Sequence, residues 1–166
     1  IAWGKFLNGG QTCIAPDYAW VPEAAIGPFV EAFRRVVGRF YGPDAEAQLQ
    51  SPDLAQVINQ SNFQRIRGLI DRSVQAGARL EMGGKYDPAR RRIAPTLLTG
   101  VTFDMPVMQE EIFGPVLPVL SYRDRWEVYA RLRTLPKPLA LYIFSGDDAV
   151  VAEVLRETSA GGTSVN

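Results

Sequence analysis

Apolar residues recur along this chain at two different spacings, and together these spacings predict helices and strands in alternation. Helical spacing covers residues 26–40, 63–74 and a shorter stretch at 150–155. Pro28 suits the first turn of the first helix, and Gly77 is placed to end the second. Short continuous apolar runs predict strands at 17–21, 78–82, 93–98, 116–120, 139–144 and 161–165.

Residues outside the apolar pattern refine these elements. Pro118 lies inside the fourth apolar run, which favours a sheet edge or an irregular strand because proline has no N–H to donate. Asp124 and Glu127 stand at capping-box spacing and predict a helix through Leu135. Residues 42–53 are rich in proline and glutamine and predict a loop.

The order of these elements predicts the fold class. Strands that alternate with helices, and that are apolar almost throughout, are typical of a mostly parallel α/β sheet with helices on both faces. The chain has 166 residues, 46% of them hydrophobic, which suits one domain with a sizeable core. We therefore expect residues 1–166 to form a single α/β domain.

Composition excludes several chemistries and partners. The chain has no histidine and one cysteine, so Ser-His and Cys-His catalysis, a Cys/His zinc site and an intrachain disulfide are all excluded. Its 18 basic and 18 acidic residues balance, and the basic run 90–92 favours a solvated loop, so we predict neither a nucleic-acid nor a membrane partner. No stretch approaches the roughly 20 apolar residues that span a bilayer, and no signal-peptide pattern opens the chain. We expect a cytoplasmic protein without a bound metal.

The single cysteine, Cys13, lies in a segment suited to a nucleophile. Residues 6–16 read Phe-Leu-Asn-Gly-Gly-Gln-Thr-Cys-Ile-Ala-Pro, so the thiol follows a glycine pair and two polar residues. A thiolate is a usable nucleophile near neutral pH, and glycines let a ligand approach the main chain closely. A free cysteine is more often a small buried hydrophobe, so this segment needs a second motif beside it.

A second motif follows about a hundred residues later. Residues 109–116 read Gln-Glu-Glu-Ile-Phe-Gly-Pro-Val. Together the two segments resemble the active-site motifs of the NAD(P)-dependent aldehyde dehydrogenases. Weaker similarities in the family's order occur at 77–84, 94–98 and 158–166, so the resemblance covers essentially the whole chain. It implies the α/β catalytic-domain fold of that family.

The resemblance also implies roles for individual residues. It makes Cys13 the catalytic nucleophile, Glu111 the residue that holds the nicotinamide ribose hydroxyls, and Phe113 the ring that packs beside the nicotinamide. A carboxylate suits its task because it can accept hydrogen bonds from two vicinal hydroxyls. Supporting roles fall on four further residues. Asn8 would shape the turn and Gln11 would hold the loop by side-chain hydrogen bonds, whereas Leu7 either lines the aldehyde tunnel or packs in the core, and Asn166 either braces the active-site turn or ends the chain in solvent.

The family's reaction needs groups that this chain lacks. The resemblance implies NAD or NADP as the cofactor, yet no Gly-x-Gly-x-x-Gly or Walker pattern occurs. The family's general-base glutamate and its oxyanion-binding asparagine both precede the cysteine segment. We therefore expect a fragment of a longer protein whose dinucleotide-binding domain lies outside it, and we expect the fragment alone to be inactive or nearly so.

Substrate and assembly follow from the resemblance more loosely. The 105–118 and 137–142 segments are similar to class 3 members, and among them to enzymes acting on coniferyl-type aromatic aldehydes. A homodimer or higher homo-oligomer is expected for the full-length enzyme. Two alternatives stay open at this point: an acylating or acyl-phosphate-reducing relative, and a non-catalytic α/β oligomerisation domain whose cysteine is structural.

Overall fold

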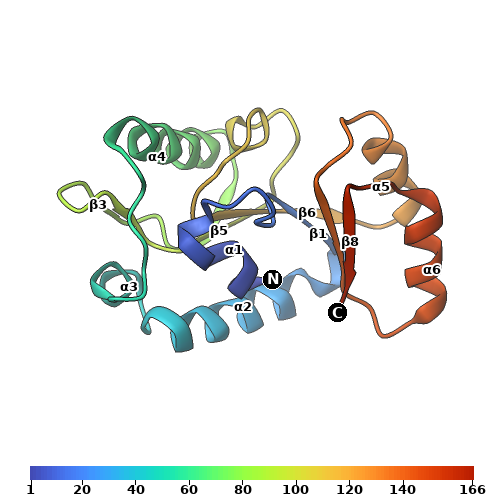
Figure 1. Ribbon diagram of the computed structural model, residues 1–166, viewed down its shortest axis with the longest axis horizontal. Helices are drawn as coiled ribbons and strands as arrows, with labels where there is room; N and C mark the ends of the chain where they lie inside the picture. Colours follow the sequence, from blue (N-terminus) through green and yellow to red (C-terminus); the bar gives the residue numbers. More distant parts are fainter. The chain divides into compact units, whose positions relative to one another are not determined.

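The computed structural model describes residues 1–166 and divides into two compact units, Ile1–Ser121 and Tyr122–Asn166 (Figure 1). Each unit has its own sheet. The first unit holds both sequence motifs, at residues 6–16 and 109–116. The second unit holds the last of the weaker family similarities, at 158–166.

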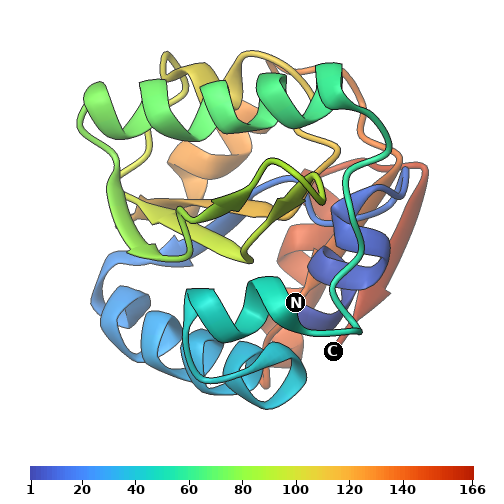
Figure 2. The ribbon, with the colours of Figure 1, turned by 90° about the vertical axis from the view of Figure 1, so that its left-hand side faces the viewer.

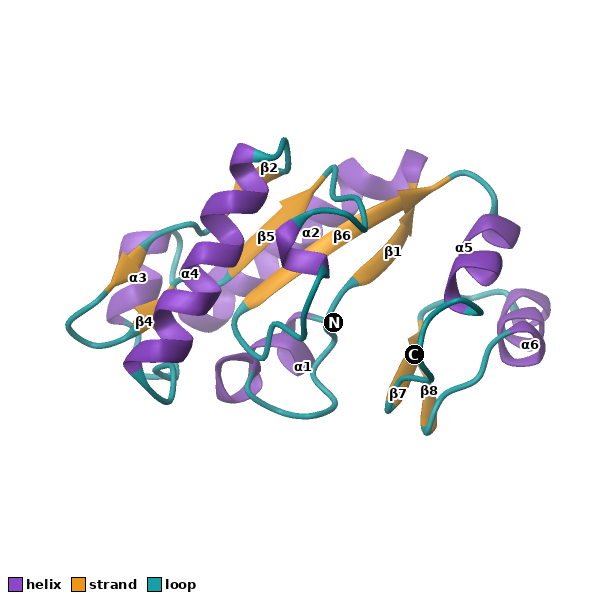
Figure 3. Cartoon of the chain, turned by 90° about the horizontal axis from the view of Figure 1, so that it is seen from above, coloured by secondary structure: helices purple, strands orange, loops and turns teal.

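The first unit is built on a four-stranded sheet in the order β1-β6-β5-β2. β5 and β6 are parallel, with Thr96 opposite Val116, whereas β2 runs antiparallel to β5. Figure 3 shows the arrows of β1, β6 and β5 pointing the same way. The strands are β1 (Ala19–Pro22), β2 (Arg79–Met82), β5 (Thr96–Thr99) and β6 (Val116–Tyr122).

Helices cover both faces of this sheet (Figure 2). On one face α4 (Gln60–Gln75) packs in a buried cluster that includes Leu98, and on the other α2 (Ile26–Tyr41) packs in a cluster that includes Leu97. Successive side chains of a strand point to opposite faces, so these adjacent leucines belong to separate cores. The predicted α/β class with a mostly parallel sheet is confirmed.

The two long helices begin and end as their sequences predict. Pro28 lies in the first turn of α2, where its missing N–H costs little. The Asn59 side chain caps α4 by accepting a hydrogen bond from Asn62 N at 2.8 Å. Gly77, at φ 107°, follows the C-cap residue of α4, which is the position that favours glycine.

Shorter elements connect these parts. β3 and β4 form a two-stranded hairpin. The arginine run 90–92 lies in its turn and at the start of β4, in agreement with the predicted loop. The short elements of the first unit are α1 (Ala2–Phe6), η1 (Leu7–Gly10), η2 (Glu23–Ala25), α3 (Ala45–Gln50), β3 (Tyr86–Asp87), β4 (Arg92–Ile93) and η3 (Pro106–Met108).

Three local predictions were wrong. Residues 42–53 are not all loop, because the Asp44 side chain caps α3 through Ala47 N at 2.8 Å and helix-forming residues follow. Pro118 is not at a sheet edge, since β6 lies between β1 and β5. The helix predicted through Leu135 ends as α5 at Leu132, and a turn follows it.

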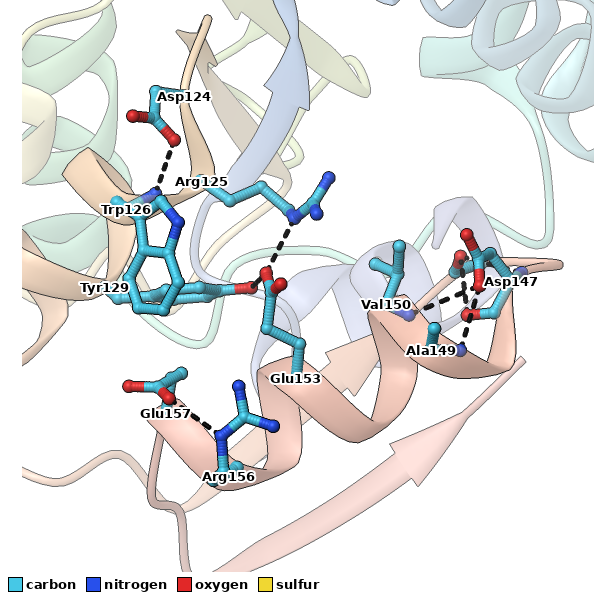
Figure 4. A network of polar contacts seen from close by, with 11 residues as sticks. Asp124, Arg125, Trp126, Tyr129, Asp147, Ala149, Val150, Glu153, Arg156 and Glu157 are labelled. Atoms are coloured by element: carbon cyan, nitrogen blue, oxygen red, sulfur yellow. Dashed lines mark hydrogen bonds and ion pairs between the residues drawn. The ribbon is translucent and has the colours of Figure 1, made fainter.

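The second unit pairs two parallel strands with two helices. Its elements are α5 (Arg125–Leu132), β7 (Ala140–Ile143), α6 (Asp148–Glu157) and β8 (Gly162–Val165), and β7 pairs with β8. Glu153 of α6 accepts from Arg125 Nε at 2.9 Å and from the Tyr129 hydroxyl at 2.8 Å, and so ties α6 to α5 (Figure 4). These bonds from Arg125 and Tyr129 hold the pKa of Glu153 below its ordinary value.

Candidate active site

The predicted nucleophile lies in an exposed turn that follows two short helical elements. In α1 the buried side chains of Ala2 and Phe6 join the core formed on α2, so the start of the segment is fixed. After η1 the chain turns, with Ala15 N donating to Thr12 O at 3.1 Å. Cys13 lies within this turn, exposed and unbridged. Its thiol is therefore accessible rather than packed in the core.

Gln11 anchors the nucleophile turn to the loop before α4. Its Nε2 donates to Asn8 O at 2.9 Å and to Gln56 O at 3.0 Å, and its Oε1 accepts from Ile58 N at 2.9 Å. One neutral amide thus satisfies three backbone groups from two segments. The Asn8 side chain adds a fourth bond by donating to Gln11 O at 3.2 Å.

Three successive residues before the turn have left-handed backbone angles. These are Asn8, Gly9 and Gly10, at φ 52°, 62° and 75°. Glycine adopts such angles without steric cost and asparagine tolerates them better than most residues. At Gly10 an added Cβ would lie 2.2 Å from Gly114 O and 3.0 Å from Lys5 O. The glycine therefore lets the cysteine segment pack backbone against backbone on the second motif.

The second motif forms a loop before β6, and charged side chains hold it. We call residues 110–114 the clamp loop. Arg65 of α4 donates from Nη1 to Glu111 O at 3.1 Å and from Nη2 to Ile112 O at 2.7 Å. The same Nη1 lies 3.3 Å from Glu110 Oε2. From the other side, Asp17 Oδ1 accepts from Ile112 N at 3.2 Å.

The predicted clamp residues project from this loop. Ile112 is buried in the core against α4, whereas Glu111 and Phe113 on either side of it are exposed. Phe113 has a φ of 48°, a left-handed angle that is strained for an aromatic residue. Gly114 then packs against Ile66, where a Cβ would lie 2.6 Å from Cδ1. The loop presents a carboxylate and a ring to solvent from a fixed base.

A buried lysine lies beneath both motifs. Lys5 of α1 is only 1% exposed. Burial lowers its pKa from 10.5 to about 8, while the negative charges of Asp17 and Glu111 oppose that shift. Burial raises the pKa of the Asp17 carboxyl, against the opposing effect of Lys5. The two motifs therefore meet at a cluster of charged residues in which only the lysine is fully buried.

This cluster was missed in the sequence. Asp17 lies in the residues that continue the cysteine motif, but no contact was expected of it, and Arg65 belongs to neither motif; their contacts join segments that are far apart along the chain. Lys5 did carry a signal, because it occupies an apolar position of α1, between Ala2 and Phe6 on the buried face. A lysine at such a position is rarely fully buried unless it is paired.

The remaining predicted residues divide between the two units. Leu7 is 48% exposed and lies four residues after Trp3, which is 67% exposed. Asn166 belongs to the second unit, where its Oδ1 accepts from Ser145 N and its Nδ2 donates to Ser145 O, both at 3.0 Å. These two bonds tie the end of the chain after β8 to Ser145, which follows β7; the role of Asn166 at the active-site turn remains a prediction.

We also searched the structure for a metal-binding group and for a membrane-spanning helix. No group of three or more cysteine, aspartate or glutamate side chains is arranged to hold a metal ion. None of the helices combines the length and the apolar character needed to cross a bilayer.

Comparison with known proteins agrees with the two motifs. The model of the aldehyde dehydrogenase family matches residues 1–166. The chain therefore belongs to the aldehyde dehydrogenase family, and the predicted resemblance is confirmed. Members of this family use NAD or NADP, so the predicted cofactor class is confirmed for the family.

Individual relatives place the chain beside the class 3 branch. It is 44% identical over 166 residues to the dimeric NADP-preferring aldehyde dehydrogenase of Bos taurus, covering 100% of the chain and 66% of that protein. It is 41% identical to the 4,4'-diaponeurosporen-aldehyde dehydrogenase of Staphylococcus aureus, covering 100% of the chain and 35% of that protein. The chain thus spans only part of the length of the relatives it matches.

A solved relative has the same fold. The substrate-bound AldH of Staphylococcus aureus superposes with a TM-score of 0.92 at 40% identity, covering 99% of this chain and 35% of that one. This agreement confirms the predicted fold. The roles of Cys13, Glu111 and Phe113 remain predictions.

Proposed function

We propose that this chain is the cysteine-bearing catalytic part of an NAD(P)-dependent aldehyde dehydrogenase that oxidises an aldehyde to a carboxylic acid. The observation that carries the proposal is the contact of Gly10 with Gly114, which packs the segment of an exposed Cys13 against the loop of Glu111 and Phe113. A nucleophile and a candidate cofactor clamp are thereby fixed to one another.

Cys13 begins the proposed reaction. Its thiolate attacks the carbonyl carbon, a C–S bond forms, and the carbonyl electron pair moves to oxygen as an oxyanion. The backbone N–H of Cys13 is one candidate donor to that oxyanion, and such a donor contributes about 3 kcal/mol. After oxidation to the thioester, water breaks the C–S bond, releases the acid and restores the thiol.

The clamp loop fits the cofactor's chemistry. Glu111 is an exposed carboxylate on a loop fixed by its own backbone, so it can accept hydrogen bonds from two ribose hydroxyls, and the exposed ring of Phe113 offers an apolar face. A bound nicotinamide would supply the acceptor for the hydride of the aldehyde carbon. The part of the site that binds the adenosine is assigned, in this proposal, to a domain outside the chain.

Four further expectations belong to this proposal. Aromatic, coniferyl-type aldehydes are the substrates we would test first, with Leu7 as the candidate lining residue. A homodimer or higher homo-oligomer is supported by the dimeric bovine relative. The chain alone, a proposed single catalytic domain without its dinucleotide-binding domain, should form no NAD(P)H, and we keep a cytoplasmic location as part of the proposal.

Relocating the single thiol tests the proposal. In the complete enzyme, Cys13→Ser should reduce NAD(P)H formation from an aromatic aldehyde by more than about a thousandfold, the scale seen when a catalytic nucleophile is removed. A double variant, Cys13→Ser with the exposed Ser61 of α4 changed to cysteine, should remain equally inactive. Turnover near the wild-type rate in Cys13→Ser would contradict the proposal.

The products separate the enzyme alternatives. Release of free acid without coenzyme A or phosphate supports the hydrolytic reaction. Strict dependence on coenzyme A or phosphate would instead identify an acylating or acyl-phosphate-reducing relative. The exposed position of Cys13 speaks against a cysteine kept only for packing.

A further inference from the structure

Lys5 is a charged group for which the proposed reaction has no use. It is 1% exposed and lies in α1, eight residues before the proposed nucleophile. An apolar side chain would fill the same space without the cost of burying an ammonium group, and buried ion pairs are seldom more stabilising than apolar packing. Its position between the two motifs therefore calls for an explanation other than packing.

The charged residues around Lys5 either belong to the clamp loop or form hydrogen bonds with it. Asp17 and Glu111 are the two carboxylates whose charges act on Lys5. Asp17 also accepts the hydrogen bond from Ile112 N, while Arg65 of α4 acts on the charge of Asp17 and binds the loop carbonyls. The charge of Lys5 is thus attracted to the loop in two ways, by the charge of Glu111 and by that of Asp17, which accepts a hydrogen bond from the loop.

Neighbouring elements add one more titratable group near this position. From α2 the Tyr41 hydroxyl donates to Phe6 O at 3.4 Å, and burial raises its pKa, so it remains neutral where Lys5 titrates. Glu110, the other acid of the loop, pairs with Arg65 on the exposed side. Lys5 itself titrates near pH 8, within the range from pH 7 to 9.5.

We propose that Lys5 is a positioning residue for the cofactor clamp: its buried ammonium, attracted by Asp17 and Glu111, holds the clamp loop in the shape in which Glu111 can bind the nicotinamide ribose. This inference rests on the proposed function of Glu111. Charged Lys5 favours the binding shape, and neutral Lys5 releases it. Cofactor affinity should therefore fall as the pH rises through about 8.

The test measures the dissociation constant of NAD⁺ for the complete enzyme at pH 7 and pH 9.5. All variants carry Cys13→Ser, so that titration of the thiol plays no part. With Lys5 present, NAD⁺ should bind about tenfold more weakly at the higher pH, within the usual range of coupling between two sites. With Lys5→Arg, which keeps its charge, the affinity should stay constant between the two pH values.

Removing the charge gives the complementary result. Lys5→Met should bind NAD⁺ about tenfold more weakly at pH 7 and show no further fall at pH 9.5. In a Glu111→Gln background, Lys5→Met should add little, because its effect acts through that carboxylate. Should Lys5→Met fail to fold, the comparison of Lys5 with Lys5→Arg across pH decides the question alone.

Failure of the inference can be told apart from failure of the proposed function. Suppose that Glu111→Gln weakens NAD⁺ binding. The positioning role of Lys5 is then wrong if NAD⁺ affinity is independent of pH with Lys5 present, or if the effects of Lys5→Met and Glu111→Gln on that affinity are additive. In either case Glu111 keeps its assignment as the cofactor clamp. If Glu111→Gln leaves NAD⁺ affinity unchanged, the clamp assignment and the inference both fall.

Discussion

The segment that carries Cys13 is held by neutral amides, whereas the clamp loop packed against it is held by charged side chains. Gln11 and Asn8 make four hydrogen bonds around the cysteine turn, none of which involves an ionised group. The clamp loop depends instead on Arg65, on Asp17 and, by our inference, on Lys5. Two neighbouring parts of one site should therefore respond differently to pH.

This difference suits the proposed tasks of the two segments. A nucleophile must keep one geometry throughout the reaction, and hydrogen bonds between neutral groups do not change with pH. A cofactor clamp must bind and release, and an ion cluster around a buried lysine offers a balance between desolvation and attraction that small changes can shift. We expect the contrast to appear in three measurements of stability.

The largest effect should come from the point where the two segments touch. Gly10→Ala would place a methyl group 2.2 Å from Gly114 O at a φ of 75°. Overpacking and left-handed strain together should lower the free energy of unfolding by about 3 kcal/mol, as measured by denaturant titration.

Gly9→Ala is the matched control for this change. Gly9 has nearly the same φ, 62°, but the nearest atom to its Cβ position is 3.4 Å away. It should lose only about 1 kcal/mol, the cost of the backbone angle. Equal losses in the two variants would show that the close packing on Gly114 is unimportant.

A smaller loss should follow from charging the anchor of the cysteine turn. Gln11→Glu keeps the shape of the side chain but removes two donors and places a carboxylate beside Asn8 O and Gln56 O. We expect the free energy of unfolding to fall by about 2 kcal/mol, because two carbonyls lose their partner.

The same substitution on the neighbouring loop provides its control. Gln56 is exposed, and its Oε1 accepts from Arg91 Nη2 at 3.3 Å, so Gln56→Glu should be neutral or slightly stabilising. A Gln11→Glu protein as stable as Gln56→Glu would mean that Gln11 does not anchor the turn.

The smallest effect should be the pH dependence of stability from Lys5. Its folded pKa of about 8 lies below its ordinary value of 10.5, so between these values the unfolded chain binds more protons than the folded chain. Stability should therefore rise with pH, by about 1.5 kcal/mol between pH 8 and 9.5.

Subtracting the pH profile of Lys5→Met from that of the wild type isolates the contribution of Lys5 to stability. The rise should be absent from Lys5→Met, whose pH profile accounts for the remaining titrations, in the same denaturant experiments. Gln11→Glu should leave the rise unchanged, since the two anchors are independent. A wild-type profile that is flat or falling relative to Lys5→Met would show that Lys5 is not buried as a charged group.

The two motifs and most of the fold could be predicted from the sequence because their signals are local. The apolar spacing of α2 and α4, the proline in the first turn and the glycine after the last turn all act within a few residues. The glycine pair of the first motif likewise favours the left-handed backbone angles that Gly9 and Gly10 adopt.

What escaped prediction depends on contacts between distant segments. Asp17 and Ile112 are 95 residues apart, and nothing near either one announces their hydrogen bond. Pro118 was expected at a sheet edge or in an irregular strand, and the first alternative is wrong because strand order is a property of the whole sheet. The α3 helix was hidden because the composition of residues 42–53 outweighed the single Asp44 cap.

The contact of Gly10 with Gly114 also limits how this enzyme could be redesigned. Two main chains meet there without side chains between them, so no compensating substitution at one position can make room for a larger residue at the other. If the proposed function holds, a library aimed at new aldehydes should leave both glycines untouched and vary the exposed Leu7 instead. The proposed lining residue tolerates substitution, whereas the junction of the two segments does not.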